Sequence, residues 1–202
     1  MHVRVFPLGP YEANCTLIWR DDGSALAIDP GADGDSVASV LRQSGLALSA
    51  VFLTHGHFDH ISGVDALLAR FPAPVFMHAG DEALAFSRFN LAQPGYGGMT
   101  RTPLLDLSLG EGDTIPGWPE AKILHTPGHS QGSCCLHFAG EALLVAGDTL
   151  FAGGSYGRTD LPGGSWPQLE QSLKRLAALP GETRVICGHG EETAIDAWRG
   201  CY

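Results

Sequence analysis

The feature that most constrains the fold is a cluster of metal-binding side chains directly after a short apolar run. The run Ala50-Val51-Phe52-Leu53 leads into His55-Gly56-His57-Phe58-Asp59-His60. Polar groups packed this closely at the end of a buried element are costly unless something compensates them. A divalent metal ion is the usual compensation, because neutral imidazole and carboxylate supply its nitrogen and oxygen ligands. We therefore expect a metal site at the end of a buried strand.

Four further polar segments each follow a predicted strand, and loops held by a rigid sheet are where active sites form. They are Asp29-Pro30-Gly31, Pro127-Gly128-His129, Gly147-Asp148-Thr149 and Gly188-His189-Gly190. Together with the first cluster they give seven candidate metal ligands: His55, His57, Asp59, His60, His129, Asp148 and His189. Seven ligands are too many for one four-coordinate ion and fit two ions that share a carboxylate.

Asp29 has two interpretations that the sequence leaves open. It is either a hydrogen-bond partner that orients the ligand loop or a turn-former before Pro30. The remaining histidines are expected to be structural or exposed: His2, His78, His125 and His137.

The order of apolar runs predicts a layered fold of strands and helices. Three runs near the N-terminus, at 3–6, 15–19 and 25–28, are separated by turns and suit antiparallel pairing. A helix is expected to begin at Asp33-Gly34-Asp35, and another to run from Ile61 to Phe71. Further strands are expected at 50–53, 74–77, 104–109, 121–124, 134–138, 142–145 and 183–186, with helices at 81–86 and 169–179. The segment Asn90 to Pro103 is expected to be a surface loop. We predict a four-layer αββα sandwich, with two mostly antiparallel or mixed sheets flanked by helices.

Composition limits the partners and the compartment. The 202 residues fit one domain, 1–202, and the net charge of −10 with 12 Lys and Arg argues against nucleic acid. No apolar run approaches the ~20 residues that span a bilayer, and no signal peptide is visible, so we expect a cytoplasmic protein without membrane partners. The 5 cysteines form no Cys-x-x-Cys pair, which indicates reduced thiols.

The motif order resembles the metallo-β-lactamase-fold hydrolases. His-x-His-x-Asp-His, Pro-Gly-His, Gly-Asp-Thr and a late Gly-His follow one another from Asn14-Cys15 to Gly188-His189-Gly190. The resemblance implies one metal held by His55, His57 and His129 and a second held by Asp59, His60 and His189. It further implies that Asp148 bridges the two ions, with a hydroxide between them. Zinc is the first expectation, and iron and manganese suit the same ligands.

Within this superfamily the chain resembles the compact glyoxalase II-like (hydroxyacylglutathione hydrolase-like) group. The run Gly147 to Phe151 and the later Gly157-Arg158-Thr159-Asp160 carry this likeness. It implies hydrolysis of S-lactoylglutathione or a related hydroxyacyl thioester by the bridging hydroxide, with Asp59 and Asp148 as catalytic residues. Arg158 matches a basic residue that contacts glutathione in larger relatives. The sequence given ends at Tyr202, without the C-terminal helical domain of those relatives, so the thiol part stays open.

Other activities share this fold. A persulfide dioxygenase has a similar Gly-Arg-Thr-Asp run but uses one iron held by two His and one Asp, so His60 and His189 favour the hydrolase. Lactone or other ester hydrolysis remains an alternative. Enzymes that hydrolyse β-lactams typically carry a cysteine at the position of Asp148. A structural zinc site is disfavoured because such sites are closed and four-coordinate.

Overall fold

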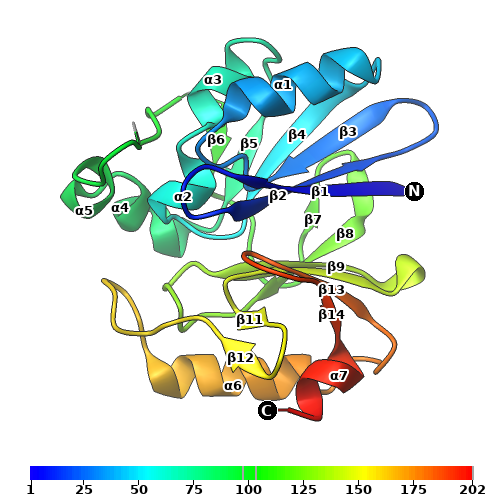
Figure 1. Cartoon of the computed structure of the whole chain (residues 1–202), viewed down its shortest axis with the longest axis vertical. Coiled ribbons are helices and arrows are strands. Elements are labelled where there is room, and N and C mark those ends of the chain that lie inside the picture. The colour runs from blue at the N-terminus through cyan, green and yellow to red at the C-terminus, as the bar shows by residue number, and fades with distance from the viewer. Residues whose placement is uncertain (97, 103, 202) are drawn as a thin grey trace.

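Two sheets pack face to face between two layers of helices in the computed structural model, which describes residues 1–96, 98–102 and 104–201 (Figure 1). The first sheet has the order β1-β2-β3-β4-β5-β6. Its strands are β1 (His2–Leu8), β2 (Ala13–Trp19), β3 (Ser24–Ile28), β4 (Ala47–Leu53), β5 (Val75–Met77) and β6 (Leu105–Asp106). The predicted antiparallel pairing of the first three strands is confirmed, whereas β3 to β6 pair in parallel.

The second sheet has the order β14-β13-β10-β9-β8-β7. Its strands are β7 (Thr114–Ile115), β8 (Trp118–His125), β9 (Cys134–Phe138), β10 (Leu143–Gly147), β13 (Arg184–Cys187) and β14 (Thr193–Ala194). Only β10 and β13 pair in parallel among these described strands. A short hairpin of β11 (Leu150–Phe151) and β12 (Ser155–Tyr156) leaves the sheet after β10.

Helices cover the outer face of each sheet (Figure 1). On the first sheet lie α1 (Gly34–Gln43), α2 (Phe58–Ile61) and α3 (Val64–Leu68), followed by η1 (Ala79–Asp81), α4 (Glu82–Ala85) and α5 (Arg88–Leu91). On the second lie α6 (Trp166–Leu176) and α7 (Ile195–Arg199), while η2 (Ala139–Glu141) joins β9 to β10. The described residues include no helix long and apolar enough to cross a membrane.

The apolar runs are continuous because strands in both sheets are buried on both faces. In β4, Val51 packs outward against α1 and α3, while Phe52 packs inward between the sheets. In β10, Leu144 packs outward against α6 and α7, while Val145 packs inward. Successive side chains of a strand point to opposite faces. Each of these two strands therefore contacts the other sheet on one face and the helices of its own side on the other. The predicted sandwich is confirmed.

One sequence prediction near the site is wrong, and a second is confirmed only in part. The helix expected from Ile61 to Phe71 is divided into α2 and α3 at Gly63, whose amide donates to the carbonyl of Pro30 (3.1 Å). A Cβ at Gly63 would lie 1.9 Å from the carbonyl oxygen of Gly31, so close backbone packing sets this break.

The expected surface loop from Asn90 to Pro103 is also different in the structure. It begins inside α5, and Tyr96 and Met99 are buried because they pack on the aromatic and aliphatic side chains of the first sheet's helical layer. Gly97 and Pro103 lie outside the described residues. The strand expected at 104–109 shortens to β6.

Candidate metal centre

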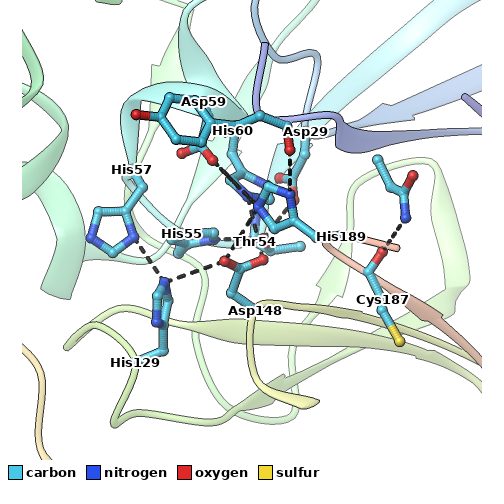
Figure 2. Close-up of polar contacts among 12 residues, drawn as sticks. Asp29, Thr54, His55, His57, Asp59, His60, His129, Asp148, Cys187 and His189 are labelled. Carbon is cyan, nitrogen blue, oxygen red and sulfur yellow. Dashed lines mark hydrogen bonds and ion pairs between the residues drawn. The ribbon is translucent and has the colours of Figure 1, made fainter. Parts of the chain in front are cut away.

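The candidate ligands converge because the strands before them end at the same side of the sandwich. Asp29 follows β3, and the segment from His55 to His60 follows β4, which runs parallel to β3. In the second sheet, Asp148 and His189 follow the parallel strands β10 and β13, and His129 follows β8. Figure 2 shows these side chains pointing toward one another between the two sheets.

One group consists of His55, His57 and His129, which we call the three-histidine group. Their ligand atoms lie within 4.8 Å of one another, and all three residues are buried. His57 Nδ1 is 2.9 Å from His129 Nε2. This group therefore joins a loop of the first sheet to a loop of the second.

Asp59, His60 and His189 form a second group, which we call the Asp59 group, and their ligand atoms also lie within 4.8 Å of one another. His189 Nε2 is 3.3 Å from both His60 Nε2 and Asp59 Oδ2. Asp148 lies between the two groups. Its Oδ1 is 3.3 Å from His60 Nε2, and its Oδ2 is 3.6 Å from both His129 Nε2 and His189 Nε2.

Oxygen atoms of the protein fix the orientation of four of the rings. The Nδ1 atoms lie against Asp29 Oδ2 for His60 (2.9 Å), Arg158 O for His129 (2.8 Å), Tyr11 O for His189 (2.9 Å) and Thr54 Oγ1 for His55 (3.0 Å). Carbonyl and carboxylate oxygens accept hydrogen bonds, and the Thr54 hydroxyl already donates to Asp29 (2.6 Å). We therefore assign the proton of each neutral ring to Nδ1, which leaves the Nε2 lone pair free.

These lone pairs test whether the site suits a metal. The Nε2 atoms of His60 and His189 face each other at 3.3 Å, and His55 Nε2 is buried without a hydrogen-bond partner among the described residues. A buried nitrogen without a partner, such as His55 Nε2, lacks the hydrogen bond that water would supply. Bound divalent cations would satisfy these lone pairs, so the nitrogen and oxygen donors fit a metal centre.

The electrostatics of the site favour the ligand forms of His55, His57 and Asp148. Burial lowers the pKa of His55 and lowers that of His57 to about 3, and neighbouring histidines add to both shifts. Burial alone would raise the pKa of Asp148, but His60 and the other imidazoles hold it well below its usual range. At neutral pH the His55 and His57 rings are neutral and Asp148 is a carboxylate, which are the states that bind a cation.

A pocket of ≈ 500 Å³ opens onto both groups. Its wall outside the ligands is largely aromatic, formed by Tyr11, Phe58, Phe89, Phe151 and Tyr156. The segment 153–157, which contains three glycines, contributes Ser155 and Tyr156 to the pocket. A pocket with apolar walls and a few convergent polar groups is typical of a small-molecule site.

Arg158, the predicted substrate-binding residue, lies at the rim of this pocket. Its guanidinium donates to both oxygens of Asp160, with Nε–Oδ1 and Nη2–Oδ2 distances of 2.7 and 2.6 Å. Both side chains are exposed. The role of this side chain stays a prediction, while its main-chain carbonyl holds His129 in place.

The structure places Asp29 as a hydrogen-bond partner of the ligand loop. Its carboxylate accepts from the Thr54 amide (2.7 Å), the Thr54 hydroxyl and His60 Nδ1. The histidines expected to be structural or exposed belong to neither group; among them, His78 and His125 stack with ring centroids 4.1 Å apart.

Several residues around the site were missed by sequence reasoning. Tyr11 supplies a carbonyl to His189, and Asn14 Nδ2 donates to the carbonyls of Cys187 (2.9 Å) and Gly190 (3.0 Å) on either side of His189. No residue pattern reports such main-chain contacts. Asp81, which accepts hydrogen bonds from Gly56 and Ser130 beside the ligands, was missed as well. It follows β5 as the other polar segments follow their strands, and this position could have identified it as a candidate.

Comparison with known proteins agrees with this geometry. The family model of the Metallo-beta-lactamase superfamily matches residues 8–189. A probable metallo-hydrolase of Bacillus subtilis, YqgX, is 37% identical over 96% of this chain and 93% of its own length. The hydroxyacylglutathione hydrolase GloC of Haemophilus influenzae is 30% identical over 96% of this chain and 93% of its own length.

Solved structures are also similar. BLEG-1, a B3 metallo-beta-lactamase, superposes with a TM-score of 0.89 at 34% identity over 97% of this chain and 95% of its own. TTHA1623 in a di-iron-bound form gives 0.86 at 36% identity over 96% of each chain. ETHE1 from Myxococcus xanthus gives 0.78 at 27% identity over 97% of this chain and 80% of its own. The matched family model spans most of the chain and the fold agrees with it, so this protein belongs to the metallo-beta-lactamase superfamily.

Proposed function

We propose that this protein is a binuclear-metal hydrolase that cleaves thioesters, with S-lactoylglutathione or a related hydroxyacyl thioester as substrate. The observation that carries the proposal is the pair of ligand groups, with Asp148 between them, at the base of a ≈ 500 Å³ pocket. The similarity to the hydroxyacylglutathione hydrolase GloC supports the reaction class.

The proposed ligands follow from the two groups. One ion would be held by the three-histidine group and the other by the Asp59 group. Asp148 would be a ligand of both ions. Two such ions would supply a water acidified towards neutral pH and would polarise the substrate carbonyl. Zinc is the first expectation; the di-iron form of TTHA1623 supports iron as an alternative, and manganese also suits these donors.

The chain's own side chains would then orient the reactants. The Asp59 carboxylate lines the pocket, where it would orient the attacking water and accept its proton. The aromatic wall would pack against the acyl or thiol part and exclude water from it. Arg158 would bind a substrate carboxylate, in competition with Asp160.

The test is hydrolysis of S-lactoylglutathione by protein loaded separately with zinc, iron and manganese. We expect metal-dependent turnover that is lost in Asp148→Ala, because this carboxylate contacts both groups. Turnover that persists in the variant would indicate a contaminating enzyme. No turnover with any metal would refute the thioesterase proposal and direct the search to lactones and other esters.

A second candidate is a persulfide dioxygenase, favoured by the run Gly157-Arg158-Thr159-Asp160, which resembles that of such enzymes. It would need one iron, whereas the complete Asp59 group favours two ions. Oxygen consumption with glutathione persulfide, together with the iron content of the protein, separates the two. The similarity to BLEG-1 makes nitrocefin hydrolysis a useful third assay.

A further inference from the structure

A single buried carboxylate links the two loops that carry the three-histidine group. Asp81 is 1% exposed and lies at the end of η1, after β5. Its Oδ2 accepts from the Gly56 amide (2.7 Å) and from the Ser130 hydroxyl (2.6 Å), and its Oδ1 accepts from the Gly132 amide (2.6 Å). No lysine or arginine pairs with it within the described part of the chain.

The donors identify what this carboxylate holds. Gly56 lies between His55 and His57, and Ser130 directly follows His129. One loop follows β4 of the first sheet and the other joins β8 to β9 of the second, so Asp81 sets their separation without touching an imidazole. Charge-assisted hydrogen bonds of this length are among the stronger and better directed ones.

Close packing shows that the fit is specific. A Cβ at Gly132 would lie 2.6 Å from the amide nitrogen and 2.8 Å from the Cβ of Asp81, so only glycine allows the second loop to approach this closely. A longer carboxylate in place of Asp81 would push the loops apart.

Asn90 holds the carbonyl group of the same residue, Gly56. Its Nδ2 donates to the carbonyl of Gly56 (2.6 Å), and Asn90 is the fully buried residue of α5. The N–H and C=O groups of Gly56 are therefore both fixed, by Asp81 and Asn90 respectively. This leaves the turn between His55 and His57 with little freedom to adjust.

We propose that Asp81 is the positioning residue of the three-histidine group, which fixes the distance between the His55–His57 loop and the His129 loop and thereby sets the metal affinity of that group. The proposal rests on the proposed metal centre. Asp29 has the corresponding place beside His60 in the Asp59 group. Loss of Asp81 would therefore weaken metal binding at the three-histidine group and leave metal binding at the Asp59 group unchanged.

The test is titration of the metal-free protein with cobalt(II), followed by visible absorbance in the presence of a competing chelator. His129→Ala and His189→Ala identify which dissociation constant belongs to which group. In Asp81→Asn we expect the constant assigned to the three-histidine group to rise about 10–100-fold while the other is unchanged. The melting temperature of each metal-free variant shows that it is folded.

Asp65→Asn is the matched control. Asp65 also accepts from a backbone amide and a hydroxyl, both of Thr100, but lies away from the pocket, so neither constant should change. Ser130→Ala removes one of the three donors and leaves the carboxylate, which gives a milder variant if Asp81→Asn does not fold. It should raise the same constant by a smaller factor.

A parallel rise of both constants, or no change in either, would overturn the positioning role. If the wild-type protein binds a single ion, the binuclear centre is refuted, and the role of Asp81 stands or falls on whether Asp81→Asn changes the constant of that ion. Failure of the binuclear centre and failure of the positioning role of Asp81 therefore give different results in this titration.

Discussion

Replacing Asn14 by alanine should destabilise the fold at the point where β2 meets the loop after β13. The side chain is buried in β2, and its Nδ2 donates to the carbonyls of Cys187 (2.9 Å) and Gly190 (3.0 Å). These carbonyls flank His189, so the two bonds fix the position of its loop relative to the first sheet. The main-chain bond from the Asn14 amide to Gly188 O (2.7 Å) survives the substitution.

The magnitude follows from the surroundings of the two acceptors. The Cys187 carbonyl belongs to a buried residue, and an acceptor left without its donor there costs about 1–3 kcal/mol. Gly190 is exposed, so water replaces its lost partner at little cost. We expect a loss of about 2 kcal/mol in the free energy of unfolding, which for a chain of this size lowers the melting temperature by about 4–8 °C.

The assay is thermal and urea unfolding of metal-free protein, because bound metal would add its own stabilisation. Asn14→Asp should be less stable than Asn14→Ala, since its carboxylate would face two carbonyl oxygens. Gln168→Ala removes an amide whose hydrogen bond from Gln131 is exposed, and serves as the control, with a change below about 0.5 kcal/mol. An Asn14→Ala variant as stable as that control would refute the reasoning.

Three further predictions concern the site. The pKa of His60 is raised because the charges of Asp148 and Asp59 outweigh the effect of burial. The pKa of His189 is raised because its hydrogen bond to Asp59 and the charge of Asp148 outweigh burial. Burial lowers the pKa of His57 to about 3. Protons therefore compete with metal at higher pH in the Asp59 group, and metal analysis of protein dialysed at decreasing pH should show that ion lost first; loss in the reverse order would contradict this. In Gly188→Ala the new methyl would lie 2.0 Å from Asp148 Oδ1, so we expect turnover to fall at least about 100-fold with the fold retained by circular dichroism, and near-normal turnover would exclude a catalytic role for Asp148. Asp160→Asn frees Arg158, so the ratio of kcat/KM for a carboxylate-bearing thioester to that for an uncharged N-acetylcysteamine thioester should rise about threefold. Glu192→Gln, which opens the similar pair with Arg184 away from the pocket, should leave this ratio unchanged.

The sequence predicted the longer elements well because their apolar patterns report burial. The run Cys134 to Phe138 is β9 with the predicted bounds, and the helix predicted to begin at Asp33-Gly34-Asp35 is α1, with the Asp33 side chain accepting from the Ser36 amide at its N-terminus. Elements of two residues, such as β7 and β14, were missed because they are too short for a periodic signal. The break at Gly63 was missed because it depends on backbone packing against Gly31.

The sequence by itself determined which side chains are available to bind metal. Their types and their places after strands follow from the motifs. The sequence also identified Asp29 as a candidate partner, and the structure places it against His60 and Thr54.

Only the tertiary structure decided how those side chains are oriented. The oxygens that fix His129 and His189 are main-chain carbonyls of Arg158 and Tyr11, and every residue carries such a carbonyl. The contacts of Asp81 likewise exist only after the two sheets pack together, because its donors come from loops of both. Main-chain partners leave no mark on residue identity, so these contacts are decided by the folded chain alone.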